Sequence, residues 1–317
     1  MSLHDLGLII HWGLYSVPAF DDPASVARRK TQNGSEWYLK RLTEKNTYRP
    51  ISGYKPTQEY HKKHYGDKSY FDFAAEFKEK SAKINFKDYT DIAKKIGAKY
   101  IVLTAKHHDG FCLWKSNHAS CGFIDILPKF IAACKAAGLE FGIYFSLFEF
   151  NKNVTRDFVD KILIPQLKEL LAFKPNMLWL DGHWAIKTKY ATETIVNLLN
   201  DAKKLIPNMQ INDRISASIK DYSNKNYLGV STFRVYEDRS LPTEEIKVPW
   251  QHINTIGLSW GRNLQPQPYK SGKELWEIYT KVKNAKGATL FNLGPDSEGK
   301  IDPRELASLI EFAGCRK

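Results

Sequence analysis

The chain has 317 residues and a formal net charge of +12, from 47 Lys and Arg against 35 Asp and Glu. This length suits a single α/β barrel, which typically needs about 250 residues, and a hydrophobic content of 43% is that of a globular protein. The basic residues are scattered, without a run of five or a nucleic-acid-binding motif, so we expect no nucleic-acid partner. No apolar stretch reaches 18 residues and the first residues do not resemble a signal peptide, so we expect no membrane association. These features leave the compartment and the oligomeric state open.

Short apolar or β-branched runs alternate along the chain with segments of helical periodicity. Eight runs are predicted to be strands, at residues 6–13, 98–108, 139–148, 176–182, 208–214, 230–237, 254–261 and 287–295. Amphipathic helices are predicted between them, around residues 89–96, 127–137, 195–202 and 275–285, with a last helix that begins at Asp302-Pro303. Gly97 and Gly138 each stand where a helix commonly ends in a left-handed residue.

Eight strands with intervening helices predict a parallel sheet, and their number favours closure into a (β/α)8 barrel over a doubly wound open sheet. The segment from about residue 14 to residue 84 is too long for a simple crossover, and we expect it to add loops and helices over one end. Because no linker, repeat or low-complexity tract interrupts the chain, residues 1–317 are predicted to form one domain.

Polar or aromatic side chains follow the predicted strands at their carboxyl ends. They are His11-Trp12, His107-His108-Asp109, Tyr144, Asp181, Asn212-Asp213-Arg214, Glu237-Asp238, Trp260 and Asn292. In a barrel all these ends meet at one mouth, where the active site is built. Histidine, arginine and carboxylate groups with aromatic walls suit a neutral polyol such as a sugar.

Cofactor and metal motifs are missing from the chain. No GxGxxG or Walker sequence follows a strand, so we expect no nucleotide cofactor. The run His107-His108-Asp109 lacks the HExxH or HxH spacing of a metal site, so we expect no metal. The four cysteines form no CxxC pair, and a Cys112–Cys121 disulfide stays open.

Several segments closely resemble the α-L-fucosidases of glycoside hydrolase family 29, in order and along nearly the whole chain. They are "GLIIHWGLYSVPAF", "GSEWY", "AKYIVLTAKHHDGFCLW", "FGIYFSLFEF", "MLWLDGHW", "INDR", "PWQHINTIGLSWG" and "LFNLGPDSEGKI". The resemblance implies a catalytic (β/α)8-like barrel over residues 1–317 that hydrolyses terminal α-L-fucosides of oligosaccharides or glycoconjugates with retention of configuration. Family members often add a C-terminal β-sandwich, which we do not expect in this chain because it stops in the predicted last helix of the barrel.

The resemblance also implies roles for individual residues. Asp181 is implied as the nucleophile that forms a covalent fucosyl-enzyme. The residues implied to bind fucose are His11, Glu36, Trp37, His107, His108, Tyr144, Trp179 and Arg214, with Trp260 as a further wall.

The second carboxyl group of the retaining mechanism has several candidates. In the family the residue after the Trp of "PWQHINTIGLSWG" is commonly the Glu that donates the proton, and here that residue is Gln251. Glu36 or Glu237 are therefore candidate acid/base residues, and the pair Glu244-Glu245 is a further possibility if the match is displaced. An alternative is a catalytically impaired homologue that binds fucose, because an amide cannot transfer a proton.

Overall fold

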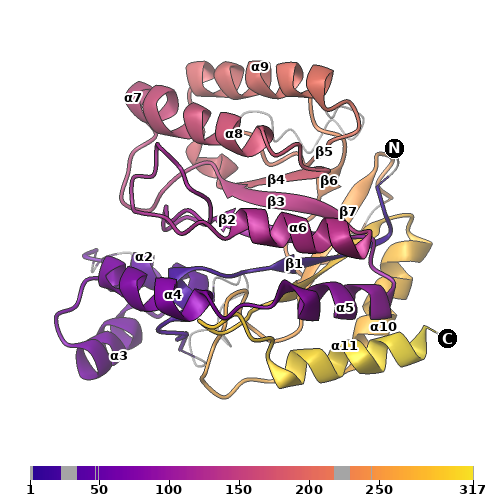
Figure 1. Ribbon diagram of the computed structural model, residues 1–317, viewed down its shortest axis with the longest axis horizontal. Coiled ribbons are helices and arrows are strands. Elements are labelled where there is room, and N and C mark those ends of the chain that lie inside the picture. Colours follow the sequence, from indigo (N-terminus) through magenta and orange to yellow (C-terminus); the bar gives the residue numbers. More distant parts are fainter. Residues whose placement is uncertain are drawn as a thin grey trace.

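The computed structural model describes residues 3–22, 34–46, 48, 50–217, 229–243 and 245–316. Eight parallel strands form one curved sheet in the order β5-β4-β3-β2-β1-β8-β7-β6. The strands are β1 (Leu6–Ile10), β2 (Tyr100–Lys106), β3 (Glu140–Ser146), β4 (Met177–Asp181), β5 (Gln210–Ile211), β6 (Arg234–Val235), β7 (Trp250–Thr255) and β8 (Ala288–Leu293). The two ends of this order meet through a single parallel bridge between Asn212 and Phe233. The predicted (β/α)8-type barrel is confirmed, and the described helices surround it (Figure 1).

Both faces of the strands are buried, which is why they appear in the sequence as continuous apolar runs. Successive side chains on a strand point to opposite faces. Thus Val102 packs inside the barrel with Trp179 and Leu290, while Ile101 and Leu103 pack outward against the helices. The barrel interior is therefore a packed core that supports the site above it.

The predicted helices form close to their expected positions. They are α5 (Phe86–Ile96), α6 (Leu127–Ala137), α9 (Lys189–Leu205), α10 (Gly272–Asn284) and α11 (Pro303–Cys315). Gly97 and Gly138 end α5 and α6 with φ of +76° and +70°. The Asp302 carboxylate caps α11 by accepting the Arg304 N–H.

One long crossover helix was not expected from the sequence. It runs from α7 (Arg156–Phe158) through a π-helical turn, η4 (Val159–Leu163), into α8 (Ile164–Leu171). Pro165 stands within it and acts in most sequences as a helix breaker. Here the proline lies in the first turn of α8, directly after the π-helical turn, where its missing N–H is tolerated.

The described part of the segment between β1 and α5 adds short helices. They are η1 (Leu14–Ser16), η2 (Ser35–Trp37), α2 (Tyr38–Leu42), α3 (Tyr54–Tyr65), η3 (Tyr70–Asp72) and α4 (Phe73–Ser81). A buried ion pair between Arg41 and Asp21 (2.9 Å) ties α2 to the loop after β1. The Tyr70 hydroxyl donates to Asp109 (2.7 Å) and ties η3 to the loop after β2.

The prediction for the seventh strand was wrong. The strand is Trp250–Thr255 and not 254–261, and it pairs with β8 from Gln251 onward. The first half of this strand contains polar residues, which are not expected in a buried strand. Gln251 and His252 are tolerated there because they make their hydrogen bonds inside the protein and not with water. After Thr255 the chain turns out of the sheet, with the Thr255 hydroxyl bonded to the Gly257 carbonyl (2.6 Å). Gln251 therefore lies within a strand, while Trp260 lies in the loop that follows.

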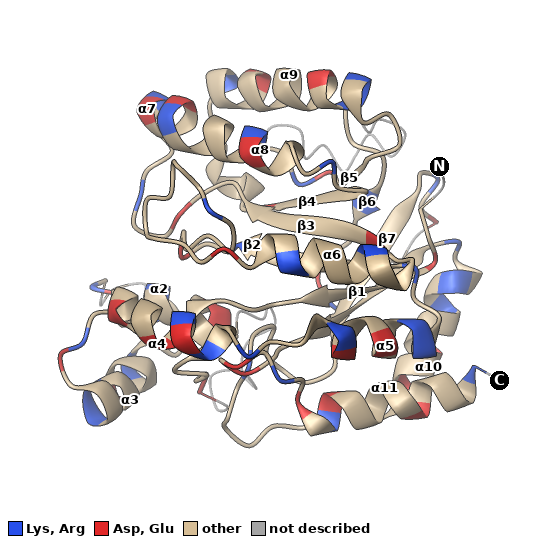
Figure 2. Ribbon diagram, viewed as in Figure 1, with Lys and Arg blue, Asp and Glu red and all other residues tan. Residues whose placement is uncertain are grey.

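The surface shows basic and acidic residues interspersed on the outer helices (Figure 2). Several form pairs one helical turn apart, such as Lys87 with Asp91 and Lys161 with Asp157. The four cysteines are free, so the Cys112–Cys121 disulfide does not form. Across the described ranges, no helix combines the length and apolar character needed to span a bilayer.

Candidate active site

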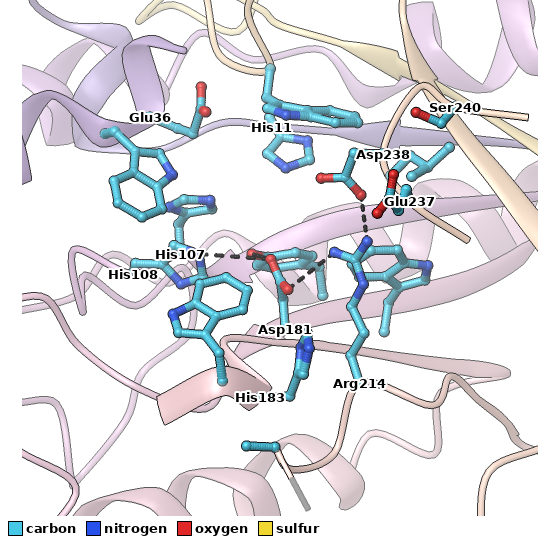
Figure 3. A pocket seen from close by; sticks show the side chains of 17 residues that line it. His11, Glu36, His107, His108, Asp181, His183, Arg214, Glu237, Asp238 and Ser240 are labelled. Atoms are coloured by element: carbon cyan, nitrogen blue, oxygen red, sulfur yellow. Dashed lines mark hydrogen bonds and ion pairs between the residues drawn. The ribbon is translucent and has the colours of Figure 1, made fainter. Parts of the chain in front are cut away.

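A cavity of about 430 Å³ opens at the carboxyl ends of the strands, within the usual size of small-molecule sites (Figure 3). It is lined by His11, Glu36, Trp37, His107, His108, Tyr144, Trp179, Asp181, His183, Trp184, Arg214, Ala217, Glu237, Asp238, Ser240, Ile253 and Trp260. Asp181, the two candidate acids Glu36 and Glu237, and all the residues implied to bind fucose lie in this lining, whereas Gln251 does not. They come from the ends of several strands, as in a barrel active site.

Asp181 is the last residue of β4 and lies nine-tenths buried in the wall of the cavity. Its Oδ2 accepts a hydrogen bond from the Tyr144 hydroxyl (2.8 Å), and its Oδ1 accepts one from Arg214 Nη1 (3.1 Å). Burial by itself raises the pKa of a carboxyl group. Arg214, His108, His183 and the Tyr144 hydrogen bond outweigh burial and lower the pKa of Asp181 to about 2. The group is therefore an ionised carboxylate at neutral pH.

Arg214 is the cation that holds this carboxylate. Its guanidinium lies over the Trp179 ring, 5.0 Å from the centroid, and its Nη2 pairs with Asp238. Two carboxylates and an aromatic face thus fix one guanidinium group in place.

His11 is fixed in one tautomer by Asn292. The Asn292 side chain donates from Nδ2 to the Trp260 carbonyl (2.7 Å), which turns its Oδ1 toward His11 Nδ1 (2.5 Å). His11 therefore carries its proton on Nδ1, and its Nε2 is an acceptor. Burial lowers the pKa of His11 to about 3, so the ring is neutral at pH 7.

His108 is oriented in the same way by Ser146. The Ser146 hydroxyl donates to the Phe148 carbonyl (2.6 Å) and so accepts from His108 Nδ1 (2.7 Å). The Nε2 of His108 then faces Asp181 Oδ2 at 3.7 Å as an acceptor. Burial lowers the pKa of His108 to about 4, so a ligand hydroxyl can donate to this neutral ring.

His107 stacks on Tyr144, with ring centroids 5.6 Å apart and an interplanar angle of 6°. Its Nδ1 has no hydrogen-bond partner among the described residues, and burial lowers its pKa well below the usual value. The ring centroids of Trp260 and His11 are 5.2 Å apart, and those of Trp37 and His108 are 5.8 Å apart. Aromatic rings therefore enclose the histidines.

The two candidate acid/base residues differ in their surroundings. Glu36 is buried, and its carboxylate accepts the backbone N–H groups of Gly34 (2.5 Å) and Gly261 (3.1 Å). Burial raises its pKa against the effect of these bonds. Glu237 is exposed, in the turn after β6, and Figure 3 shows it on the opposite side of the cavity from Glu36.

Gln251 lies inside the barrel and does not line the cavity. Its side chain is fully buried, where Oε1 accepts from Trp179 Nε1 (2.8 Å) and Nε2 donates to the Tyr100 hydroxyl (2.7 Å). The geometry thus differs from the expectation that this residue stands at an acid/base position. Glu245 does not line the cavity either, and Glu244 falls outside the described residues.

Two other residues at strand ends have structural contacts. The Asn212 side chain pairs with both backbone groups of Leu180, each at 2.8 Å. Asp109 accepts from Tyr70 and from the Phe111 N–H. Among the described residues, no group of three or more His, Cys, Asp or Glu side chains could hold a metal ion.

Sequence reasoning missed several residues of the lining, among them His183, Trp184 and Ser240. His183 and Trp184 directly follow the Asp181-Gly182 turn, so their place beside a strand-end carboxylate was a usable signal. Trp184 is 40% exposed and lies at the outer edge of the site.

Comparison with known proteins matches the sequence to a family over nearly its whole length. The family model described as Alpha-L-fucosidase covers residues 4–314. The α-L-fucosidase of Dictyostelium discoideum is 33% identical over 332 residues, which are 96% of this chain and 67% of that protein. The plasma α-L-fucosidase of Homo sapiens is 30% identical over 323 residues, 93% of this chain and 62% of that protein. The chain thus spans about two thirds of the length of these relatives.

Solved structures agree. The crystal structure of Thermotoga maritima α-fucosidase in complex with fucose has a TM-score of 0.79 and 27% identity, and the match covers 98% of this chain and 71% of that one. An α-L-fucosidase of Bacteroides thetaiotaomicron, 23% identical with a TM-score of 0.76, shares the fold. From the family model and these relatives, the chain belongs to the α-L-fucosidase family.

Proposed function

We propose that this chain is a retaining α-L-fucosidase whose nucleophile is Asp181. The observation that carries the proposal is an ionised carboxylate, held by Arg214 and Tyr144, in the wall of a cavity whose neutral histidines can bind hydroxyl groups. A nucleophile must be deprotonated, and a pKa of about 2 meets this requirement at any physiological pH.

The reaction has two steps. In the first, an Asp181 oxygen attacks the anomeric carbon of a terminal α-L-fucoside, and an acid protonates the departing glycosidic oxygen. In the second, the same acid/base residue removes a proton from water, and this water displaces Asp181 from the anomeric carbon. His11 and His108 accept hydrogen bonds from ring hydroxyls, and the aromatic walls enclose the C5 methyl group.

Glu237 is the better candidate for the acid/base residue. An acid/base must exchange protons with the leaving oxygen and with water, and the exposed Glu237 carboxyl lines the cavity where water can reach it. Both carboxylate oxygens of Glu36 already accept backbone N–H groups. A protonated Glu36 would lose one of these bonds, so its role is to bind substrate and to hold the loops that carry Gly34 and Gly261.

The impaired homologue was inferred from Gln251 alone. Since Gln251 makes two hydrogen bonds inside the barrel, its amide is not evidence for a missing acid. A fucose-binding protein without turnover is therefore the second candidate, and the first experiment below separates it from the enzyme.

The test uses 4-nitrophenyl α-L-fucoside, whose leaving group hardly needs an acid, and methyl α-L-fucoside, whose leaving group does. We expect the chain to hydrolyse both and to release α-L-fucose as the first product, measured by nuclear magnetic resonance. Asp181→Asn should abolish turnover of both substrates, and Glu237→Ala should lose about 10²–10⁴-fold on the methyl glycoside. Azide should restore turnover of the nitrophenyl glycoside by Glu237→Ala.

Three results would contradict the proposal. Binding of fucose with no turnover of either substrate would support the impaired homologue. Initial release of β-L-fucose would mean inversion of configuration. If Glu36→Gln shows the azide rescue and Glu237→Ala does not, Glu36 is the acid/base residue.

A further inference from the structure

The barrel has its weakest strand pairing between β5 and β6. Each strand has two residues, and among the described residues only the Asn212–Phe233 bridge joins them in the sheet. A few bonds stand in for a longer ladder here: the Thr232 N–H donates to the Ile211 carbonyl (2.7 Å), and Asp213 accepts the Val235 N–H (2.9 Å). The turn after β6, which carries Glu237, therefore receives little support from β5. On its other side β6 pairs with β7, and the Tyr236 N–H donates to the Gln251 carbonyl (3.2 Å).

The backbone of that turn is tightly folded. The Ser240 N–H donates to the Glu237 carbonyl (3.1 Å), and the Arg239 N–H donates to the Ile253 carbonyl (3.0 Å). Arg239 has a φ of +64°, a conformation that is uncommon for residues other than glycine and persists where neighbouring contacts enforce it. Its guanidinium lies 4.9 Å from the centre of the Trp260 ring, so one side of the turn rests on the loop after β7.

The other side of the turn is held by Asp238. Its carboxylate pairs with Arg214 Nη2, while Arg214 Nη1 bonds Asp181 at 3.1 Å. The Arg214 side chain is 9% exposed and that of Asp238 is 41% exposed, so the pair lies at the border between the buried site and solvent. Figure 3 shows Asp238 and Glu237 next to each other, with Arg214 joined to both Asp181 and Asp238.

We propose that Asp238 is a positioning residue for Glu237. Its ion pair with Arg214 binds the turn of residues 237–240 to the guanidinium that also holds Asp181. The ion pair thereby fixes the position of Glu237 relative to the nucleophile. Asp238 itself transfers no proton and does not attack the substrate. This inference rests on the proposed function, because it assigns Asp238 a role in proton transfer by Glu237.

The role predicts a specific pattern of losses. A displaced Glu237 impairs protonation of a poor leaving group more than departure of a good one. Loss of Asp238 should therefore resemble a partial loss of Glu237. A residue that only stabilised the fold would lower the activity on both substrates equally.

The experiment compares wild type, Asp238→Ala, Asp238→Asn, Glu237→Ala and the double variant Glu237→Ala/Asp238→Ala. The control is Asp201→Ala, which removes an exposed ion pair with Lys204 on the outer helix α9. We expect Asp238→Ala to lose about 10–100-fold in kcat/KM on methyl α-L-fucoside, a fraction of the range for general acid catalysis. We expect a loss of less than about tenfold on 4-nitrophenyl α-L-fucoside, with rescue by azide. Asp238→Asn keeps the shape and one hydrogen bond, so its loss should be smaller.

The double variant is the decisive measurement. If Asp238 acts through Glu237, its removal from the Glu237→Ala background should cause no further loss on the methyl glycoside. Equal losses on both substrates that multiply with the loss from Glu237→Ala would overturn the role of Asp238. Full activity of Asp238→Ala on the methyl glycoside would do so as well. A wild-type chain that is inert toward both fucosides would overturn the proposed function together with this inference.

Discussion

Gln251→Glu tests the interpretation of the residue on which sequence and structure differ most. Gln251 is fully buried, accepts from Trp179 Nε1 at 2.8 Å and donates to the Tyr100 hydroxyl at 2.7 Å. A protonated Glu can keep both contacts, since its carbonyl oxygen accepts and its O–H donates. An ionised Glu cannot donate and would bury a charge without a cation among these contacts. The folded variant should therefore hold the new carboxyl protonated.

The energetic consequence depends on pH. In the unfolded chain Glu ionises with a pKa of about 4.3. If the folded state keeps this carboxyl protonated, the free energy of unfolding falls by about 1.36 kcal/mol for each pH unit above that value. The folded pKa is raised, so the unfolded state binds fewer protons and the free energy of unfolding falls as pH rises. Between about pH 5.0 and about pH 7.5 the variant should lose about 3.4 kcal/mol relative to wild type.

Urea denaturation at the two pH values measures this difference. Gln251→Met is the matched control: it removes both hydrogen bonds without adding a titrating group, so its loss should be the same at both pH values. Hydrolysis of methyl α-L-fucoside should not improve in Gln251→Glu. A variant with the pH dependence of wild type, or with turnover raised by the factor of about 10²–10⁴ of a new general acid, would refute the placement of residue 251 in the barrel interior.

Three further predictions follow from single contacts. Burial raises the pKa of Glu305 to about 8, above its value in the unfolded chain, so the free energy of unfolding should fall as pH rises from about 4.5 to about 8. Glu305→Gln should make the thermal unfolding temperature less dependent on pH over this range, and the same pH dependence as wild type would contradict the prediction. Tyr144→Phe removes the hydrogen bond to Asp181, which is worth about 1.5–3 kcal/mol for a charged acceptor. The value of kcat/KM should fall about 10–100-fold, and the acidic limb of its pH profile should move to higher pH. An acidic limb at the wild-type pH would argue against the bond. Asn292→Ala removes the hydrogen bond that fixes the tautomer of His11 and should raise KM about fivefold, the effect of one hydrogen bond of about 1 kcal/mol. The same KM in the variant and in wild type would show that this tautomer does not matter for binding.

The barrel could be predicted because its strands and helices carry local signals. Both faces of β2 and β4 are buried, so their sequences are continuous apolar runs. Gly97 and Gly138 mark the ends of helices through a backbone conformation that favours glycine. Such patterns depend on neighbours within one turn or strand and can be recognised without the rest of the fold.

The strands β5, β6 and the first half of β7 carried weaker signals. The first two have two residues each, and side chains such as Asp213 take over the bonds of a longer ladder. Local periodicity predicts that the polar residues of β7 face solvent. In the structure Gln251 instead makes its hydrogen bonds with residues of β2 and β4. These partners are distant in the chain, so the true limits of the strand were not recognisable from local periodicity.

By itself, the sequence determined the barrel, the rim of polar strand ends and the cavity-lining residues that the family resemblance implies. Only the tertiary structure decided which carboxyl groups share the cavity and what each one contacts. It brings Glu237 and Asp238 to the side of the cavity where Arg214 reaches Asp181, while Glu36 is bound by backbone N–H groups. The physical reason is that a residue type fixes what a side chain can donate or accept, whereas its burial and partners are set by segments far away in the chain.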